Sequence, residues 1–453
     1  MKKWIMGLVA VAGCGSMALA QQTDNALVEK YRSILASGGT QALIQAVSGS
    51  LMEAVKEGPS TAAPAPAAAP LTPAKTWADS TKLTGDVRFR EELRQDHKKN
   101  PVGQPGDTVD YDRLRVRLGL ESQVNDNVKV GIRVTTDGYK AGTGTSAGTP
   151  GGDPQSGNQD LTQAASKKMI FLDLGYIDWN LFGPDNSELH AVLGKMNNPF
   201  ITMNDDLVWD PDTTPEGVAL KGNLDLSPVT LLGNLGWLIL NNQDSASVKH
   251  DQVDLYAAQG ALQYEFCPEA KLTLGVSDYY FQGIKNFAPS LADVTVGSGG
   301  TTSFGNDLTG AGGGYLYGYD VVQPFASLDL FPTVCDRVLP VSLYGQKVDN
   351  VLAQHLGEGY MGGITLGKAK NPQTFEVGAS YSRLQRDATL GLWTDSDRWG
   401  GGTDGDGYKF YVKYVILKNL YTQITYYNDR KAIDAANKGT IYDRYAFDLV
   451  ASF

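Results

Sequence analysis

The stretch YAFDLVASF, residues 445–453, alternates between apolar side chains and side chains that are mostly small or polar. The apolar set is Tyr445, Phe447, Leu449, Ala451 and Phe453. Successive side chains of a β-strand point to opposite faces. The alternation therefore predicts a strand with one face toward hydrocarbon and the other toward a wetter space.

A strand of this kind with an aromatic residue at its end resembles the C-terminal signal of bacterial outer-membrane barrels. The resemblance implies that the apolar set of residues 445–453 serves as a barrel-assembly signal and that the chain meets the barrel-assembly machinery. The alternative is an ordinary amphipathic strand without a targeting role.

Residues 1–20 have the three parts of a secretory signal peptide. Lys2 and Lys3 form a basic region, an apolar run extends from Trp4 to Ala12, and residues 18–20, ALA, form a small-x-small cleavage site. The apolar run is too short to span a membrane as a helix. Residues 11–14, VAGC, offer an alternative, a lipoprotein box that would leave Cys14 as a lipidated N-terminus.

Two segments follow the signal peptide. Residues 21–57 contain apolar residues at helical spacing, which predicts a short helical segment. Residues 58–79 form a Pro/Ala-rich linker, which we expect to be extended and without a core. The helical segment could oligomerise, anchor the chain in the periplasm, plug a pore or remain a leader without fixed structure.

From Leu83 onward the hydrophobic pattern has a period of two, as in Leu83, Gly85, Val87 and Phe89. Runs of about ten residues are long enough for a tilted strand to cross a bilayer. We predict strands near residues 83–93, 111–122, 128–137, 168–181, 189–197, 217–226, 229–241, 252–266, 271–282, 316–331, 338–348, 358–367, 373–385, 407–418, 420–430 and 441–453.

The connections between these strands fall into short turns and long loops. The long loops lie around residues 94–110, 138–167, 198–216, 283–315 and 386–406. Short turns on one rim and long loops on the other are typical of outer-membrane barrels. The predicted fold class is therefore all-β, a transmembrane antiparallel β-barrel of about 16 strands over residues 80–453. A soluble β-sandwich is the alternative.

Composition and motifs exclude several functions. The net charge of −11 argues against nucleic acid as a partner, because nucleic-acid binding needs a basic surface. The four histidines are widely spaced, and H-E-x-x-H, C-x-x-C-H and G-x-S-x-G are absent from the sequence. We therefore expect no enzyme, no metal site and no cofactor. The acidic loop at residues 395–407 suits calcium only loosely, since its spacing differs from that of an EF-hand.

Three stretches resemble the bacterial "putative porin" family. They are LTGDVRFREE (83–92), DYDRLRVRLGLESQVNDNVKVGIRVTT (110–136), and GKMNNPF (194–200) followed by DLVWDPDTTPEGVAL (206–220). The resemblance extends from residue 80 to residue 453. It implies a β-barrel of the Gram-negative outer membrane that conducts small solutes, and it implies no particular substrate.

Apolar and charged residues alternate along the predicted strands. If the apolar residues face lipid, the charged residues face the lumen, because a charge on the lipid face costs about 2–4 kcal/mol at the middle of the bilayer. The predicted pore-lining basic residues are Arg88, Arg90, Arg113, Arg115, Arg117, Lys129, Arg133, Lys409, Lys413 and Arg444. Since a barrel closes by pairing its first and last strands, we expect a basic arc across the closure seam.

The long loop 198–216 carries opposing charge. Its acidic residues are Asp205, Asp206, Asp210, Asp212 and Glu216. The third loop of general porins folds into the pore, and this analogy makes the loop the predicted constriction. An acidic loop facing a basic wall creates a transverse field that sets ion preference. The alternative is a hydrated outer cap, with the arginines paired to Asp86, Glu92 and Asp112.

Cys267 and Cys335 fall in predicted periplasmic turns of successive hairpins. Neighbouring turns can approach within disulfide range, so a Cys267–Cys335 bridge competes with two free thiols.

The leading functional hypothesis is a homotrimeric porin, surrounded by outer-membrane lipid, through which small hydrophilic solutes and ions diffuse passively. An anion- or phosphate-selective channel and a structural outer-membrane anchor are the alternatives. A barrel enzyme is disfavoured because no nucleophile motif lies near a histidine.

Overall fold

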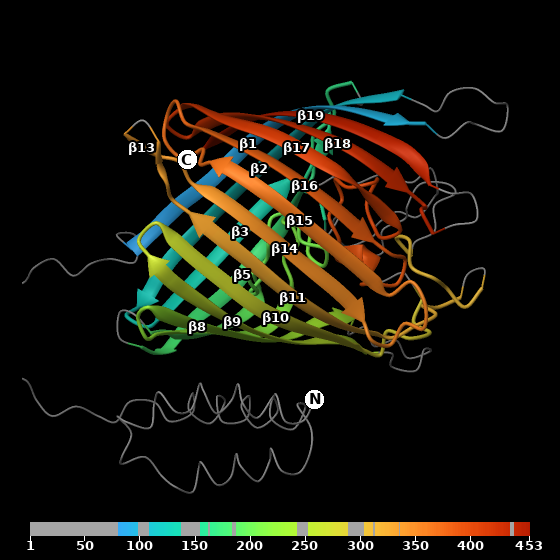
Figure 1. Ribbon diagram of the computed structural model, residues 1–453, viewed down its shortest axis with the longest axis horizontal. Helices are drawn as coiled ribbons and strands as arrows, with labels where there is room; N and C mark the ends of the chain where they lie inside the picture. Colours follow the sequence, from blue (N-terminus) through green and yellow to red (C-terminus); the bar gives the residue numbers. More distant parts are fainter. Residues whose placement is uncertain are drawn as a thin grey trace, which may run out of the picture. The chain divides into compact units, whose positions relative to one another are not determined.

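The described residues form one closed barrel of sixteen long antiparallel strands in the computed structural model (Figure 1). They belong to one unit, Ser80–Phe453. The expected signal peptide, helical segment and linker, at residues 1–79, lie outside the described residues. The structure describes residues 80–97, 108–136, 155–161, 164–183, 187–241, 252–288, 303–310, 313–334, 336–434 and 439–453.

The wall consists of β1 (Thr81–Asp96), β2 (Thr108–Asn125), β3 (Val128–Thr136), β5 (Ile170–Phe182), β6 (Leu189–Lys195), β7 (Glu216–Asp225), β8 (Val229–Asn241), β9 (Val253–Cys267), β10 (Ala270–Gln282), β11 (Tyr319–Leu330), β14 (Val341–Asn350), β15 (Glu358–Gly367), β16 (Phe375–Leu384), β17 (Gly405–Leu417), β18 (Leu420–Lys431) and β19 (Thr440–Ser452). Each strand pairs with its neighbours in the wall, and β1 pairs with β19. The predicted sixteen-stranded barrel is confirmed, with strand ends displaced by a few residues.

Three short strands are not part of the sixteen-stranded wall. β4 (Gln159–Asp160) pairs with β2, while β12 (Thr333–Val334) and β13 (Arg337–Val338) form a small hairpin. No helix among the described residues is long and apolar enough to cross a membrane.

The two faces of the wall differ as the alternation predicts. On β1, Leu83, Val87 and Phe89 are exposed, whereas Asp86 and Arg90 are buried. On β19, Tyr445, Phe447 and Leu449 are exposed in the same way. The apolar residues therefore cover the outer face, and the charged residues point into the barrel.

Aromatic side chains on the inner face lie against glycines on the neighbouring strand. A Cβ added to Gly378 would lie 2.1 Å from the ring of Tyr411, which is directly opposite it on β17. The arrangement recurs in three further cross-strand pairs: Tyr344 with Gly363, Tyr176 with Gly131, and Phe325 with Gly275. Glycine thus lets a large ring lie along the wall.

The barrel closes at Gly85 and Phe453. The Gly85 amide donates to the Phe453 carbonyl at 3.0 Å, and the Phe453 amide donates back at 2.9 Å. A Cβ on Gly85 would lie 2.5 Å from the Phe453 ring and 2.6 Å from the Arg117 carbonyl oxygen. The closing pair therefore requires glycine at position 85.

We predict that Gly85→Ala destabilises the barrel by about 1–3 kcal/mol, because neither the ring nor the neighbouring strand can yield fully to the added methyl group. The temperature at which the folded band unfolds on a heat-modifiability gel should fall. Gly233→Ala on β8 is the matched control, since nothing lies within 4 Å of its added Cβ. Equal unfolding temperatures for the two variants would contradict the role of Gly85.

Candidate functional site

Residues 196–215, between β6 and β7, cross the inside of the barrel; we call them the crossing loop. Near its start, the Ile201 amide donates to Oε1 of Gln259 on β9 at 2.8 Å, and the Gln259 amide returns a bond to the Ile201 carbonyl at 2.9 Å. Further on, Asp206 accepts from Gln323 on β11 at 3.0 Å.

The crossing loop then reaches the opposite wall. Asp205 forms an ion pair with Lys409 on β17 and accepts from Ser380 on β16. Asp212 pairs with Arg115 at 3.0 Å and with Arg117 at 3.4 Å, both on β2. Contacts with strands from β9 around to β2 show that the loop spans the lumen.

A second loop, residues 385–404 between β16 and β17, packs onto the first; we call it the packing loop. It contains a short 3-10 helix, η2 (Gly391–Trp393). Trp393 stacks on Trp209 with ring centroids 4.9 Å apart. Asp210 ties the loops together, because its amide donates to the Trp393 carbonyl at 2.6 Å and its carboxylate accepts from the Ser396 amide at 2.8 Å.

The two loops share an apolar core with the inner face of β8 to β16. Phe200 and Trp209 of the crossing loop contact Tyr279 on β10 with ring centroids 5.4 and 5.8 Å away. Other buried members are Leu207, Val208, Leu238, Val253, Leu255, Phe281, Tyr319, Val321, Tyr344, Val348, Met361, Leu384, Leu390, Leu392 and Trp399. This side of the lumen is thus filled like a protein interior.

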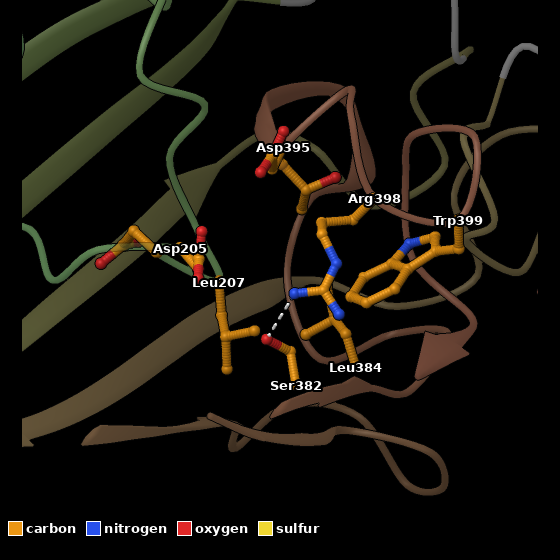
Figure 2. Close-up of a pocket in the computed structure, with 9 residues that line it drawn as sticks. Asp205, Leu207, Ser382, Leu384, Asp395, Arg398 and Trp399 are labelled. Atoms are coloured by element: carbon orange, nitrogen blue, oxygen red, sulfur yellow. Dashed lines mark hydrogen bonds between the residues drawn. The ribbon is translucent and has the colours of Figure 1, made fainter. Parts of the chain in front are cut away.

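Arg398 anchors the packing loop to the wall (Figure 2). Its buried guanidinium points at Ser382 on β16 and donates to that hydroxyl at 3.0 Å. It also pairs with Asp429 on β18 at 3.0 Å and donates to the Gly407 carbonyl at 2.8 Å. The sequence predicts a loop at residues 386–406 but not its packing inside the barrel. Its one signal was the apolar run at residues 390–393, LGLW, within a Gly- and Asp-rich segment.

Five of the ten predicted pore-lining cations lie buried or half-buried in ion pairs, and Arg115, paired with Asp86 and Asp212, is one of them. Arg444 contacts Glu92 at 2.6 Å and Asp397 at 2.7 Å. Arg90 contacts Asp448 at 2.7 Å and Asp397 at 3.1 Å. Arg113 pairs with Glu92 and Asp160, and Lys409 pairs with Asp205. These cations hold the loops and the seam together rather than standing free along a pore.

The other five predicted cations include the most exposed ones. Arg117 and Arg133 have side chains that are 25% and 22% exposed, and Lys129 is 37% exposed. Arg133 pairs with Asp173 and Lys129 with Asp178. The remaining two are Arg88, which is 12% exposed, and Lys413.

The five predicted acidic constriction residues occupy different environments. Asp206 and Asp210 are buried, and Asp205 is paired with Lys409. Asp212 touches the basic wall and is 23% exposed. Glu216 is the first residue of β7 and pairs with Lys195 at 3.1 Å, so assigning it to the loop was wrong.

Two further expectations concern cysteines and metal. Cys267 is exposed at the end of β9, and Cys335 lies outside the described residues, so the disulfide stays a prediction. Within the described part of the chain, no group of three His, Cys, Asp or Glu side chains is arranged to hold a metal ion.

A closed antiparallel barrel with an apolar exterior, a charged interior and a loop folded through its lumen is the architecture of an outer-membrane channel. Residues 101–306 and 340–453 match the model of the family described as "Putative porin". The chain belongs to this family, whose fold and membership imply a channel in the outer membrane rather than an enzyme.

Three solved structures are similar to this chain. OprB of Pseudomonas putida at high pH has a TM-score of 0.51 and 9% identity, covering 83% of this chain and 94% of its own. Salmonella typhi OmpF in complex with daunomycin has a TM-score of 0.46 and 12% identity, covering 83% and 99%. A loop-deletion mutant of Vibrio cholerae OmpT has a TM-score of 0.42 and 12% identity, covering 83% and 100%. No curated protein matches the chain.

Two buried carboxyls of the crossing loop have shifted proton affinities. Burial raises the pKa of Asp206 to about 6, although the amides of Val208 and Trp209 donate to the carboxylate and lower it. Burial, together with the nearby carboxylate of Asp395, raises the pKa of Asp210 well above its usual range. Because both pKa values are raised by burial, protonation of Asp206 and Asp210 stabilises the packed state of the loop.

The pKa of Asp206 predicts pH-dependent loosening of the crossing loop. Between its ordinary value of 3.8 and about 6, the packed state binds more protons than the unpacked state, so packing weakens as the pH rises through this window. We expect conductance to rise from about pH 5 to about pH 7.5, by roughly twofold more than in Asp206→Asn. Planar-bilayer recordings measure this ratio.

Asp206→Asn keeps an oxygen acceptor for the two amides but removes the titration. Asp225→Asn, at the exposed end of β7, is the matched control and should retain the wild-type ratio. A wild-type ratio in Asp206→Asn would show that other groups govern the dependence.

Proposed function

We propose that the protein is a porin through which small hydrophilic solutes and ions diffuse passively, with its constriction where the crossing loop meets the basic wall. The observation that carries this proposal is the contact of Asp212 with Arg115 and Arg117, made by a loop that also reaches β9, β11, β16 and β17. Such a loop narrows the lumen at one level.

The distribution of apolar and polar residues supports a passage along β1 to β5. The apolar core occupies the side of β8 to β16, and its members are largely inaccessible. The partly exposed charges, including Arg117, Arg133, Lys129 and Asp212, lie on the other side. Water and hydrated ions favour this charged side, because an apolar lining offers no hydrogen bonds.

At the proposed constriction, acid and base touch directly. Arg115 Nη1 lies 3.0 Å from both Asp212 oxygens. Direct pairing screens both charges and confines the transverse field to the immediate neighbourhood of Asp212. The ion preference of the channel therefore depends on how many wall cations remain unpaired.

The sequence also supports proposals about export, membrane insertion and assembly. We propose export by a cleaved signal peptide, insertion by the barrel-assembly machinery, and assembly as a homotrimer surrounded by outer-membrane lipid.

Asp212→Asn tests the constriction. Removal of this carboxylate should free positive charge on Arg115 and Arg117 and raise the permeability of chloride relative to potassium by roughly twofold or more. The reversal potential across a salt gradient in a planar bilayer measures this change. Glu269→Gln, in the exposed turn between β9 and β10, removes a carboxylate away from the lumen and should leave the reversal potential unchanged.

An unchanged reversal potential in Asp212→Asn would place the constriction elsewhere. If the wild-type barrel is folded and heat-modifiable but never conducts, the channel proposal is wrong, and a role as a structural outer-membrane anchor is favoured.

Trp393→Ala tests the role of the packing loop. Loss of the stack on Trp209 should weaken the apolar core by about 3–5 kcal/mol and raise single-channel conductance, while the wall strands keep their pairing. Phe375→Ala removes an exposed outer-face aromatic as a control. Wild-type conductance in Trp393→Ala would mean that this core does not limit the passage.

A further inference from the structure

Arginines face one another across the β1–β2 pair. Arg88 is directly opposite Arg115, and Arg90 is directly opposite Arg113. Like charges in directly opposed positions are destabilising unless something neutralises them. The carboxylates around these two arginine pairs therefore show where positive charge is left over.

The Arg90–Arg113 pair is neutralised. Asp448 holds Arg90 with two hydrogen bonds of 2.7 and 2.9 Å, and Asp397 adds a contact at 3.1 Å. Arg113 has Asp160 at 2.8 Å. These side chains leave no spare cation at this level.

In the Arg88–Arg115 pair, only Arg115 has carboxylates at close range. Arg115 shares Asp86 and Asp212 with Arg117. Among the described residues, Arg88 donates to the uncharged side chain of Asn158 at 2.5 Å, and its ion pair, with Asp448, is long, at 3.8 Å. That carboxylate already holds Arg90 at 2.7 Å.

Donors of this pair also lack acceptors. The Nε groups of Arg88 and Arg115 are both enclosed and donate to no protein group within the described structure. Enclosed guanidinium N–H groups without an acceptor are costly, and an anion with several oxygens satisfies them best. The side chain of Arg88 as a whole is 12% exposed, so a part of it other than the enclosed Nε remains accessible.

A third cation approaches from the other side of the seam. Arg88 is opposite Val450 on β19, and Val450 is opposite Tyr421 on β18. The Lys413 ammonium on β17 lies 4.1 Å from the centre of the Tyr421 ring. Glu376 on β16 is opposite Lys413 in the register, but the described part of the chain forms no ion pair with Lys413, whose ammonium lies against the Tyr421 ring.

We propose that Arg88, Arg115 and Lys413, with Tyr421 between them, form a binding subsite for a small oxyanion, either inorganic phosphate or a carboxylate. The guanidinium donors have fixed directions that suit the separated oxygens of an oxyanion, whereas chloride offers one centre. The lysine adds a point charge. The subsite rests on the proposed channel function and assigns the substrate class that this channel favours.

The test compares block of chloride current by phosphate and by succinate in wild type, Arg88→Gln, Lys413→Gln and Lys347→Gln. Lys347 is on the outer face of β14, paired with Glu358, so its variant loses the same charge away from the lumen. We expect saturable block in wild type, at least about tenfold weaker block in Arg88→Gln and Lys413→Gln, and unchanged block in Lys347→Gln.

Broadening of the phosphorus NMR line of phosphate by detergent-solubilised protein gives a readout that needs no conduction, and the heat-modifiable gel shift checks folding. Broadening that is lost in folded Arg88→Gln supports the subsite even if the barrel never conducts, in which case the channel proposal alone fails. A conducting wild type without block or broadening by either anion overturns the subsite and leaves the channel intact. Equal block in all four proteins also overturns it. Block by one anion alone assigns the subsite to that anion.

Discussion

Antiparallel pairing of β1 with β19 is the constraint on which the rest of the molecule depends. A bilayer offers no partner to an open sheet edge, so a membrane-spanning sheet must close on itself. The closing register extends from Asp86 opposite Ser452 to Asp96 opposite Tyr442. A slip of one residue would turn the inner charges toward lipid, because side chains alternate with a period of two. Closure therefore also determines which charges meet inside.

The charges that closure brings together mainly form ion pairs between the wall and the loops inside the barrel. A buried ion pair stabilises only when its partners make further hydrogen bonds, since removing both charges from water is costly. Arg444 and Arg90 meet this condition by sharing Asp397, which belongs to the packing loop and not to the wall. The packing loop thus supplies a carboxylate that pairs with cations of the wall, and these ion pairs in turn hold the loop in place. The same reciprocity links Lys409 to Asp205 of the crossing loop.

The strands could be predicted from the sequence because their signal is local: a period of two needs only neighbouring residues. The inner orientation of the charges followed from the same alternation. Their partners could not be predicted, since Asp397 meets Arg90 across 307 positions of sequence and Asp448 meets it across 358. The packing loop has no periodicity, and only Leu390, Leu392 and Trp393 hinted at burial. Glu216 looked like a loop acid because polarity alone does not separate a strand end from a loop.

The interior has an apolar side and a charged side, and in the proposed channel this division links width to selectivity. An apolar core packs or separates as a unit, because close-packed side chains do not deform gradually. The crossing loop belongs to that core through Trp209 and to the charged wall through Asp212. If the loop moves, it changes the cross-section of the passage and also uncovers Arg115 and Arg117. In the proposed channel, the position of this one loop therefore determines both width and ion preference, and a change that widens the passage also makes it more basic.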